Sequence, residues 1–254
     1  MIGRVSIWIV VLLWAFGSAD CQETVTKEQI LQNILRKAEQ NEKLIEDYGY
    51  SIKSTERKLK EDGTVKEEKT RTYKIVWIQD EAYAQLIEID GKKLDAKQMK
   101  EEEKRRRDFE KKLKTAKDKD SEDDFEWKDL YEKYDFSELS PEQDGAYTLA
   151  FEPKRNRVRE RNRMEKILNH LKGTFRADKD FNLLNVQASL NSPVRFALGL
   201  LAKIDSLDIE YAQQRFENVS MPSLLRYKFT GRLAVFRSER REHIAEFYAF
   251  SHRD

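Results

Sequence analysis

The sequence predicts an α+β fold: one large curved antiparallel sheet of roughly nine to eleven strands, with helices inserted between them. Three observations predict it. Apolar residues alternate with polar ones through much of the chain after Tyr48, turn dipeptides interrupt this alternation, and an amphipathic helix precedes it. Because so wide a sheet must curl or be covered, we expect the helices to cover it.

The N-terminus has the order of a secretory signal peptide (residues 1–19). Arg4 precedes an apolar run, Val5–Phe16, and the small residues Gly17–Ala19 follow it. A transmembrane anchor is the alternative, but about a dozen apolar residues are too few, because a helical span needs roughly 20. We therefore expect export, cleavage near Ala19, a single domain at residues 20–254, and no membrane span in that domain.

The charges balance, and the chain has a single cysteine. There are 48 Lys and Arg against 47 Asp and Glu, so no global field favours nucleic acid, and we expect no nucleic-acid partner. Cys21 lies at the place of a lipid-modified cysteine after a signal, yet Asp20 directly before it favours a free thiol. A single cysteine excludes an intramolecular disulfide framework, so a packed core must stabilise the domain.

A helix begins at Thr26. Thr26 and Gln29 form a capping box, and Val25 and Ile30 occupy the positions of a hydrophobic staple. Apolar residues then recur at helical spacing to about Asp47, so one face of this helix must pack against the sheet.

Three strands follow this helix as a meander. Asp62-Gly63 and Asp90-Gly91 are hairpin signals between runs that alternate with a period of two. The segment Thr64–Thr72 is polar on both faces, so we expect it to project beyond the core.

Three charged segments occupy the middle of the chain. Between Lys100 and Asp120, 17 of 21 residues are charged. This predicts a solvated helix over about 95–119. The helix is either a solvent-facing connection held by i,i+4 ion pairs or a docking arm. Residues 120–144 interleave acids with aromatic residues, which favours an irregular, partly helical segment. A basic helix is expected between Lys154 and Lys172, with a face that is either solvated or a rim for anionic lipid head groups.

Strands dominate the last third of the chain. A turn is expected at Asp178–Asp180, and Val194–Leu201 is expected to form a short helix or a tucked loop. The clearest alternation runs from Leu225 to Val235, where apolar residues oppose Lys and Arg, so one face is buried and the other is wet and basic. The final strand, Ile244–Phe250, is apolar on both faces.

Several segments match a known pattern in their order along the chain. After the N-terminal helix and hairpin they are Ile89–Leu94, Glu101–Arg107, Ala150–Pro153 with the basic helix, Gly173–Asp178, Pro222–Phe236 and Glu242–Ser251. In this order the chain resembles the lipoprotein-carrier superfamily, the LolA/LolB-like fold, and bacterial outer-membrane lipoprotein-sorting-like proteins. The resemblance implies a periplasmic half-barrel whose concave face, closed by helices, encloses an apolar cavity for acyl chains. A charged insertion at about 95–124 departs from the simple carriers.

Function is therefore expected to be the binding or carriage of a lipid or of the acyl chain of a lipoprotein. Large apolar residues on the strands are expected to form the binding wall: Tyr73, Ile75, Trp77, Leu149, Phe151, Phe175, Leu184, Val186, Tyr227, Phe229, Leu233 and Val235. Each of them has an alternative role as ordinary sheet core. The second hypothesis is a structural or interaction protein of the envelope that docks a partner through the charged helix 95–119.

Sequence motifs for catalysis are missing. His170, His243 and His252 lie on no HExxH or HxH spacing, and there is no Gly-x-Ser-x-Gly elbow, P-loop or Rossmann fingerprint. We expect neither an enzyme nor a metal or cofactor. The expected partners are a lipid or an acylated protein, with an envelope protein as a further possibility.

Overall fold

A computed structural model describes residues 26–115, 133–139, 145–154, 163–196, 202–233 and 237–253. The expected signal peptide, Cys21, Val235 and most of the acidic segment lie outside these residues. Within the described ranges, none of the helices combines the length and the apolar character that a bilayer crossing requires.

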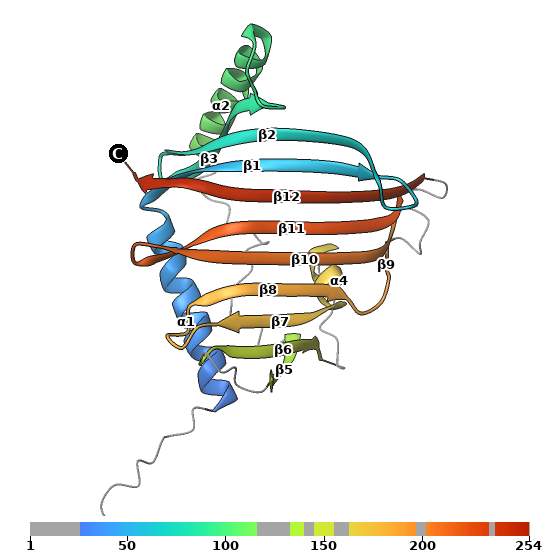
Figure 1. Ribbon diagram of the computed structural model, residues 1–254. Coiled ribbons are helices and arrows are strands. Elements are labelled where there is room, and N and C mark those ends of the chain that lie inside the picture. Colours follow the sequence, from blue (N-terminus) through green and yellow to red (C-terminus); the bar gives the residue numbers. More distant parts are fainter. Residues whose placement is uncertain are drawn as a thin grey trace, which may run out of the picture.

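The described residues contain twelve strands, which form one open antiparallel sheet (Figure 1). The strands are β1 (Tyr48–Leu59), β2 (Val65–Ile78), β3 (Glu81–Ile89), β4 (Lys92–Lys93), β5 (Tyr134–Leu139), β6 (Tyr147–Pro153), β7 (Leu171–Ala177), β8 (Leu183–Leu190), β9 (Val194–Phe196), β10 (Ala202–Phe216), β11 (Val219–Leu233) and β12 (Arg237–His252). They lie in the order β4-β3-β2-β1-β12-β11-β10-β8-β7-β6-β5, with β9 beside β10. The α+β prediction is thus confirmed, and β12 joins the first strands of the chain to the last ones.

The described part of the chain contains three helices. They are α1 (Lys27–Ile45), α2 (Ala96–Thr115) and α4 (Arg163–Leu168). The predicted capping box is present in α1, because the Thr26 side chain accepts from the backbone of Gln29 while the Gln29 side chain accepts from the backbone of Thr26. Ile30, Leu31 and Ile34 are buried on the sheet, as the helical spacing predicts.

Both predicted Asp-Gly hairpins are confirmed. They connect β1 to β2 and β3 to β4, and both glycines have positive φ, 84° at Gly63 and 72° at Gly91. The turn residue Asp90 also accepts a hydrogen bond from the backbone N–H of Thr70 at 2.9 Å. The outer residues of β2, Val65–Glu68, are exposed, but Lys69–Arg71 are half-buried and Thr72 is buried, so only the first half of the polar segment projects beyond the core.

Three segments differ from the sequence predictions. The end of the acidic segment is strand β5, because Tyr134 and Phe136 alternate with polar residues and pack in the core. Val194–Phe196 is a short strand paired with β10 and not a helix or loop. The helix ahead of Lys172 ends early: Leu171 is buried at the start of β7, where it pairs with Leu190 of β8.

The two faces of the sheet differ in chemistry. Cross-strand partners share a face, so a row of partners can be followed from β7 to β2. On the face that packs against α1, called the α1 face, the row reads Phe175, Val186, Tyr211, Leu225, Ala245, Ser54 and Arg71. On the opposite face, called the polar face, a row reads Lys172, Ser189, Asp208, Lys228, Glu242, Arg57 and Glu68.

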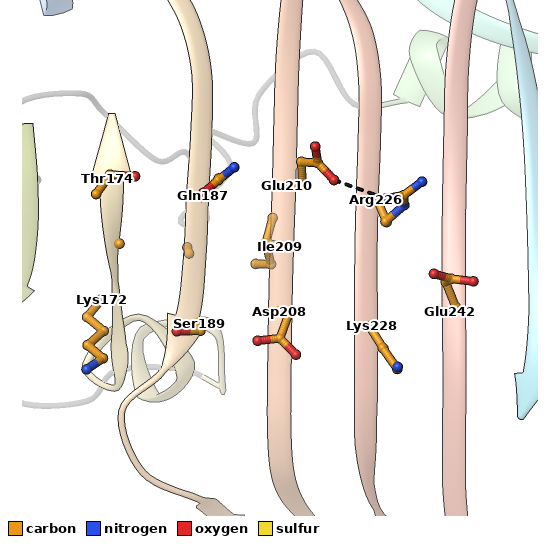
Figure 2. Close-up of a pocket in the computed structure, with 12 residues that line it drawn as sticks. Lys172, Thr174, Gln187, Ser189, Asp208, Ile209, Glu210, Arg226, Lys228 and Glu242 are labelled. Carbon is orange, nitrogen blue, oxygen red and sulfur yellow. Dashed lines mark hydrogen bonds and ion pairs between the residues drawn. The ribbon is translucent and has the colours of Figure 1, made fainter. Parts of the chain in front are cut away.

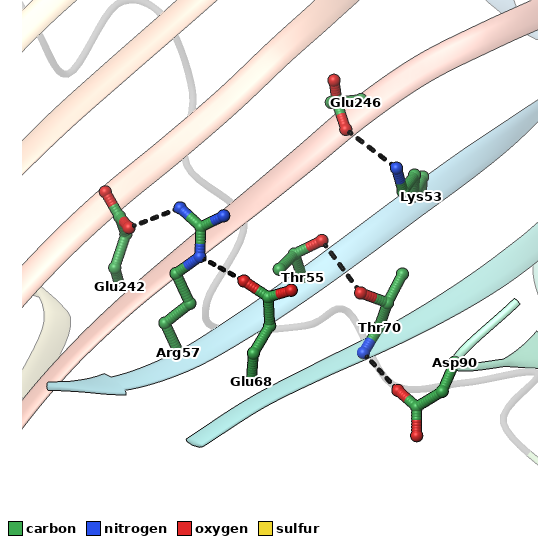
Figure 3. Close-up of polar contacts among 8 residues, drawn as sticks. All are labelled: Lys53, Thr55, Arg57, Glu68, Thr70, Asp90, Glu242 and Glu246. Atoms are coloured by element: carbon green, nitrogen blue, oxygen red, sulfur yellow. Dashed lines mark hydrogen bonds and ion pairs between the residues drawn. The ribbon is translucent and has the colours of Figure 1, made fainter. Parts of the chain in front are cut away.

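Polar contacts cross-link the strands on the polar face (Figure 3). The Arg57 guanidinium contacts Glu68 at 2.6 Å and Glu242 at 3.1 Å, so one side chain joins three strands. The hydroxyl groups of Thr55 and Thr70 lie 3.4 Å apart beside it. These contacts support the register, although each exposed ion pair contributes only about 0.2–1 kcal/mol.

Candidate functional site

The α1 face carries the main hydrophobic core at one end of the strands. Leu149 is fully buried, and the rings of Phe151 and Phe175 stack with centroids 4.7 Å apart. The buried side chains of α1 close this end, and Val186 packs at its border. Four of the predicted wall residues therefore meet here, where they fill the space between the helix and the sheet.

Beyond α1 the same face continues over β10 and β11 with apolar side chains that are less covered. Leu207 pairs with Phe229, and Tyr211 pairs with Leu225, so their side chains extend the row from the core. Tyr227 lies between these pairs and leaves 38% of its surface exposed. An apolar wall thus runs from the buried core to a partly open aromatic residue.

His243 marks the polar end of this wall. Its ring stacks on Tyr227 with centroids 4.9 Å apart, and its Nε2 lies 2.8 Å from the hydroxyl of Ser54. Nδ1 of His243 is buried and has no hydrogen-bond partner among the described residues. Burial lowers the pKa of His243, although the Glu56 carboxylate acts in the opposite direction. The imidazole is therefore neutral near neutral pH, and its Nε2 and the Ser54 hydroxyl share one hydrogen bond.

A cavity of about 110 Å³ opens beside His243 and Tyr227. Its lining residues are Glu56, Arg57, Lys58, Glu67, Lys69, Tyr227, Arg241, Glu242 and His243. Burial also raises the pKa of Tyr227, so its hydroxyl stays protonated and can donate a hydrogen bond. The volume holds a few water molecules or a small polar group, while the neighbouring wall can hold an apolar chain.

The other predicted wall residues have different surroundings. On β2, Ile75 is buried, the indole of Trp77 donates to the backbone oxygen of Tyr48 at 2.9 Å, and the ring of Tyr73 lies under the Arg105 guanidinium at 5.8 Å. Tyr73 therefore contacts α2, while Trp77 contacts the start of β1 and the Arg253 guanidinium. These three residues are not brought together with the Tyr227 cavity.

Leu184 lies at a shift in strand register, and Leu233 lies at the end of its strand. The register of β7 and β8 shifts at Ala177, which pairs with Leu183, so Leu183 joins the core while Leu184 stays half-buried. Leu233 pairs with Arg237 at the end of β11, and its side chain lies outside the described part.

The polar end of the site was missed by sequence reasoning. His243 was considered only as a metal ligand or catalytic residue, and Ser54 and Glu56 lie nearly 190 positions before it in the chain. The available signal was the alternation of Arg241, His243 and Ala245, which places all three on one face of a strand. Among the described residues, no group of three or more His, Cys, Asp or Glu could hold a metal ion.

A larger hollow of about 620 Å³ lies on the polar face (Figure 2). Charged side chains of both signs line it, including Lys172, Asp208 and Lys228, and Glu210 pairs with Arg226 at 3.3 Å. An acyl chain there would bury charged groups without compensation, which is costly. The hollow is larger than the cavity beside His243, but its chemistry excludes it as an acyl-chain site.

No protein-family model matches this chain, and no curated protein sequence matches it. Among solved structures, it is similar to the crystal structure of a DUF1329 family protein from Desulfovibrio piger, with 10% sequence identity and a TM-score of 0.36. The likeness covers 89% of this chain and 92% of that chain. At this TM-score it carries no argument about function, so the resemblance to the LolA/LolB-like carriers stays a prediction.

Proposed function

We propose that this chain is a non-enzymatic, periplasmic binding or carrier protein for a lipid or for the acyl chain of a lipoprotein. The acyl chain lies along the α1 face over β10 and β11, and the polar head group lies toward the cavity beside His243. One observation carries the proposal: the apolar wall of this face ends at the partly exposed ring of Tyr227, next to a polar cavity.

Chemistry supports this orientation of the ligand. A binding site for a small amphipathic molecule needs apolar walls and a few polar groups that fix the orientation. Leu225, Tyr227 and Phe229 supply the wall, while Lys69 and Arg241 can meet a head group. The reverse orientation would place the head group against the closed core of Leu149 and bury it without partners.

Titration with a fluorescent long-chain fatty acid tests the proposal. The wild-type chain is expected to bind it saturably, and Tyr227→Asp is expected to weaken binding about tenfold or more, because a carboxylate would lie against the acyl chain. Thr230→Asp is the matched control, since it adds the same charge on the same strand but on the polar face. The proposal fails if the wild type takes up no fatty acid, or if both variants bind equally well.

A further inference from the structure

Helix α2 lies at the edge of the sheet near β3 (Figure 1), and side chains on one side of the helix anchor it there. The hydroxyl of Tyr83 on β3 donates to the buried carboxylate of Glu102 at 2.7 Å, and Arg105 contacts the same carboxylate at 2.9 Å. The ring of Phe109 lies 5.1 Å from that of Tyr83. These anchors cover the part of β3 that β4 does not pair with, and they fix which side of α2 faces away from the sheet.

Opposite the anchors lies an unbroken row of basic side chains, called here the basic ridge. Its members are Lys97, Lys100, Lys104, Arg107, Lys111 and Lys114. Their spacing of three and four residues puts them on one stripe of an α-helix, because each residue turns the helix by about 100°. On the same count, the middle of the ridge lies roughly 180° around the helix from Glu102, Arg105 and Phe109.

Acidic residues neutralise the first half of the ridge only weakly. All six side chains are exposed. Arg107 lies 4.0 Å from Glu103, and Lys111 lies 4.0 Å from Asp108, both pairs being long and solvated. Lys97, Lys100 and Lys104 are in none of the ion pairs found among the described residues. The ridge therefore presents a line of positive charge roughly 25 Å long at 1.5 Å per residue.

The shape and the flanks of the ridge select the kind of partner. Glu101 and Asp108 lie along one flank, and Glu103 and Glu110 lie along the other. In a nucleic-acid groove, phosphates line both walls, so these carboxylates would face negative charge. A flat anionic surface meets only the ridge itself and leaves both acidic flanks in water.

We propose that the basic ridge of α2 docks on the surface of an anionic lipid bilayer. Clusters of four to eight Lys and Arg residues bind such surfaces, and each residue strengthens binding by about fivefold at moderate ionic strength. Because the ridge holds no large apolar side chain, the contact is electrostatic and reversible. This surface is separate from the α1 face and does not depend on the proposed function.

Vesicle co-sedimentation of the full chain tests the proposal. We expect binding to vesicles of equal parts phosphatidylglycerol and phosphatidylcholine, no binding to pure phosphatidylcholine, and release when high salt shortens the screening length to about 3 Å. The variant Lys97→Gln/Lys100→Gln/Lys104→Gln should bind about 100-fold more weakly. Glutamine keeps the helix propensity, and the melting temperature checks that the fold is retained.

The matched control is Lys60→Gln/Lys66→Gln/Lys179→Gln, which removes the same charge from exposed turns and strand ends away from α2. It should bind anionic vesicles within about twofold of the wild type. The proposal is wrong if the wild type does not bind anionic vesicles, if neutral vesicles bind equally well, or if the two triple variants lose the same amount of binding.

Discussion

Two rows of cross-strand partners span the same strands, from β7 to β2, on opposite faces of one sheet. The row on the α1 face begins with Phe175 and Val186 in the core, whereas the row on the polar face alternates charges from Lys172 to Glu68. Both rows belong to the same seven strands of one antiparallel sheet, so the side chains make the difference. The α1 face carries the main core and the apolar wall, and the polar face carries polar contacts that cross-link the strands.

The largest expected effect comes from the buried end of the α1 face. Leu149→Ala should lower the free energy of unfolding by about 2–5 kcal/mol, because the fully buried side chain leaves a cavity among Phe151, Phe175 and α1. Urea unfolding of the wild type and the variant measures this loss in the free energy of unfolding. A loss below about 1 kcal/mol would show that this end is loosely packed.

A smaller loss of stability is expected at Gly173, where β7 and β8 approach closely on the α1 face. A Cβ at Gly173 would collide with the backbone oxygen of Gln187 and lie 2.7 Å from the ring of Phe151. Gly173→Ala should therefore cost about 1–3 kcal/mol. Gly49→Ala is the control, because its Cβ would meet no atom closer than 3.7 Å. Equal melting temperatures of the two variants would contradict this close packing.

His243 predicts a pH dependence of the α1 face. Burial lowers the pKa of the folded-state imidazole below 6.5, the value for the unfolded chain. At a pH between these two values, the unfolded chain therefore binds a proton that the folded chain does not bind. Stability from the neutral ring is fully present above pH 6.5, falls as the pH drops below that value, and stops falling below the folded pKa. His243→Gln should flatten this part of the urea-unfolding profile; an unchanged profile would contradict the prediction.

The smallest effect is expected on the polar face. Arg57→Met removes the contacts with Glu68 and Glu242 but keeps an apolar stem, so the loss should be only about 0.2–1 kcal/mol. It should shrink further in high salt, because the pairs are partly exposed. A loss as large as that of Leu149→Ala would mean that the polar face contributes equally to stability.

Local signals in the sequence predicted much of the fold. The capping box at Thr26 and the Asp-Gly turns at Gly63 and Gly91 depend on neighbouring residues only, and all three are confirmed. Strand β5 was missed because the alternation from Tyr134 is short and lies in an acidic segment. Strand β9 has only three residues, and its pairing with β10 makes it a strand.

Only part of the candidate site could be predicted from the sequence. Period-two spacing placed Tyr227 and Phe229 on one face, and the structure agrees. Spacing within a strand does not reveal which distant strand lies beside it. The contact of Ser54 with His243 joins residues 189 positions apart, and it depends on β12 pairing with β1. The polar end of the site could therefore not be predicted without the register between distant strands.

Photocrosslinking with a diazirine-bearing long-chain fatty acid tests the central claim most directly, because mass spectrometry of the labelled chain reports which face the acyl chain touches. We expect saturable labelling of Leu225, Tyr227 and Phe229 on β11, reduced by excess unlabelled fatty acid. Labelling that does not saturate, or that falls on Arg226, Lys228 and Thr230 of the same strand, would contradict it.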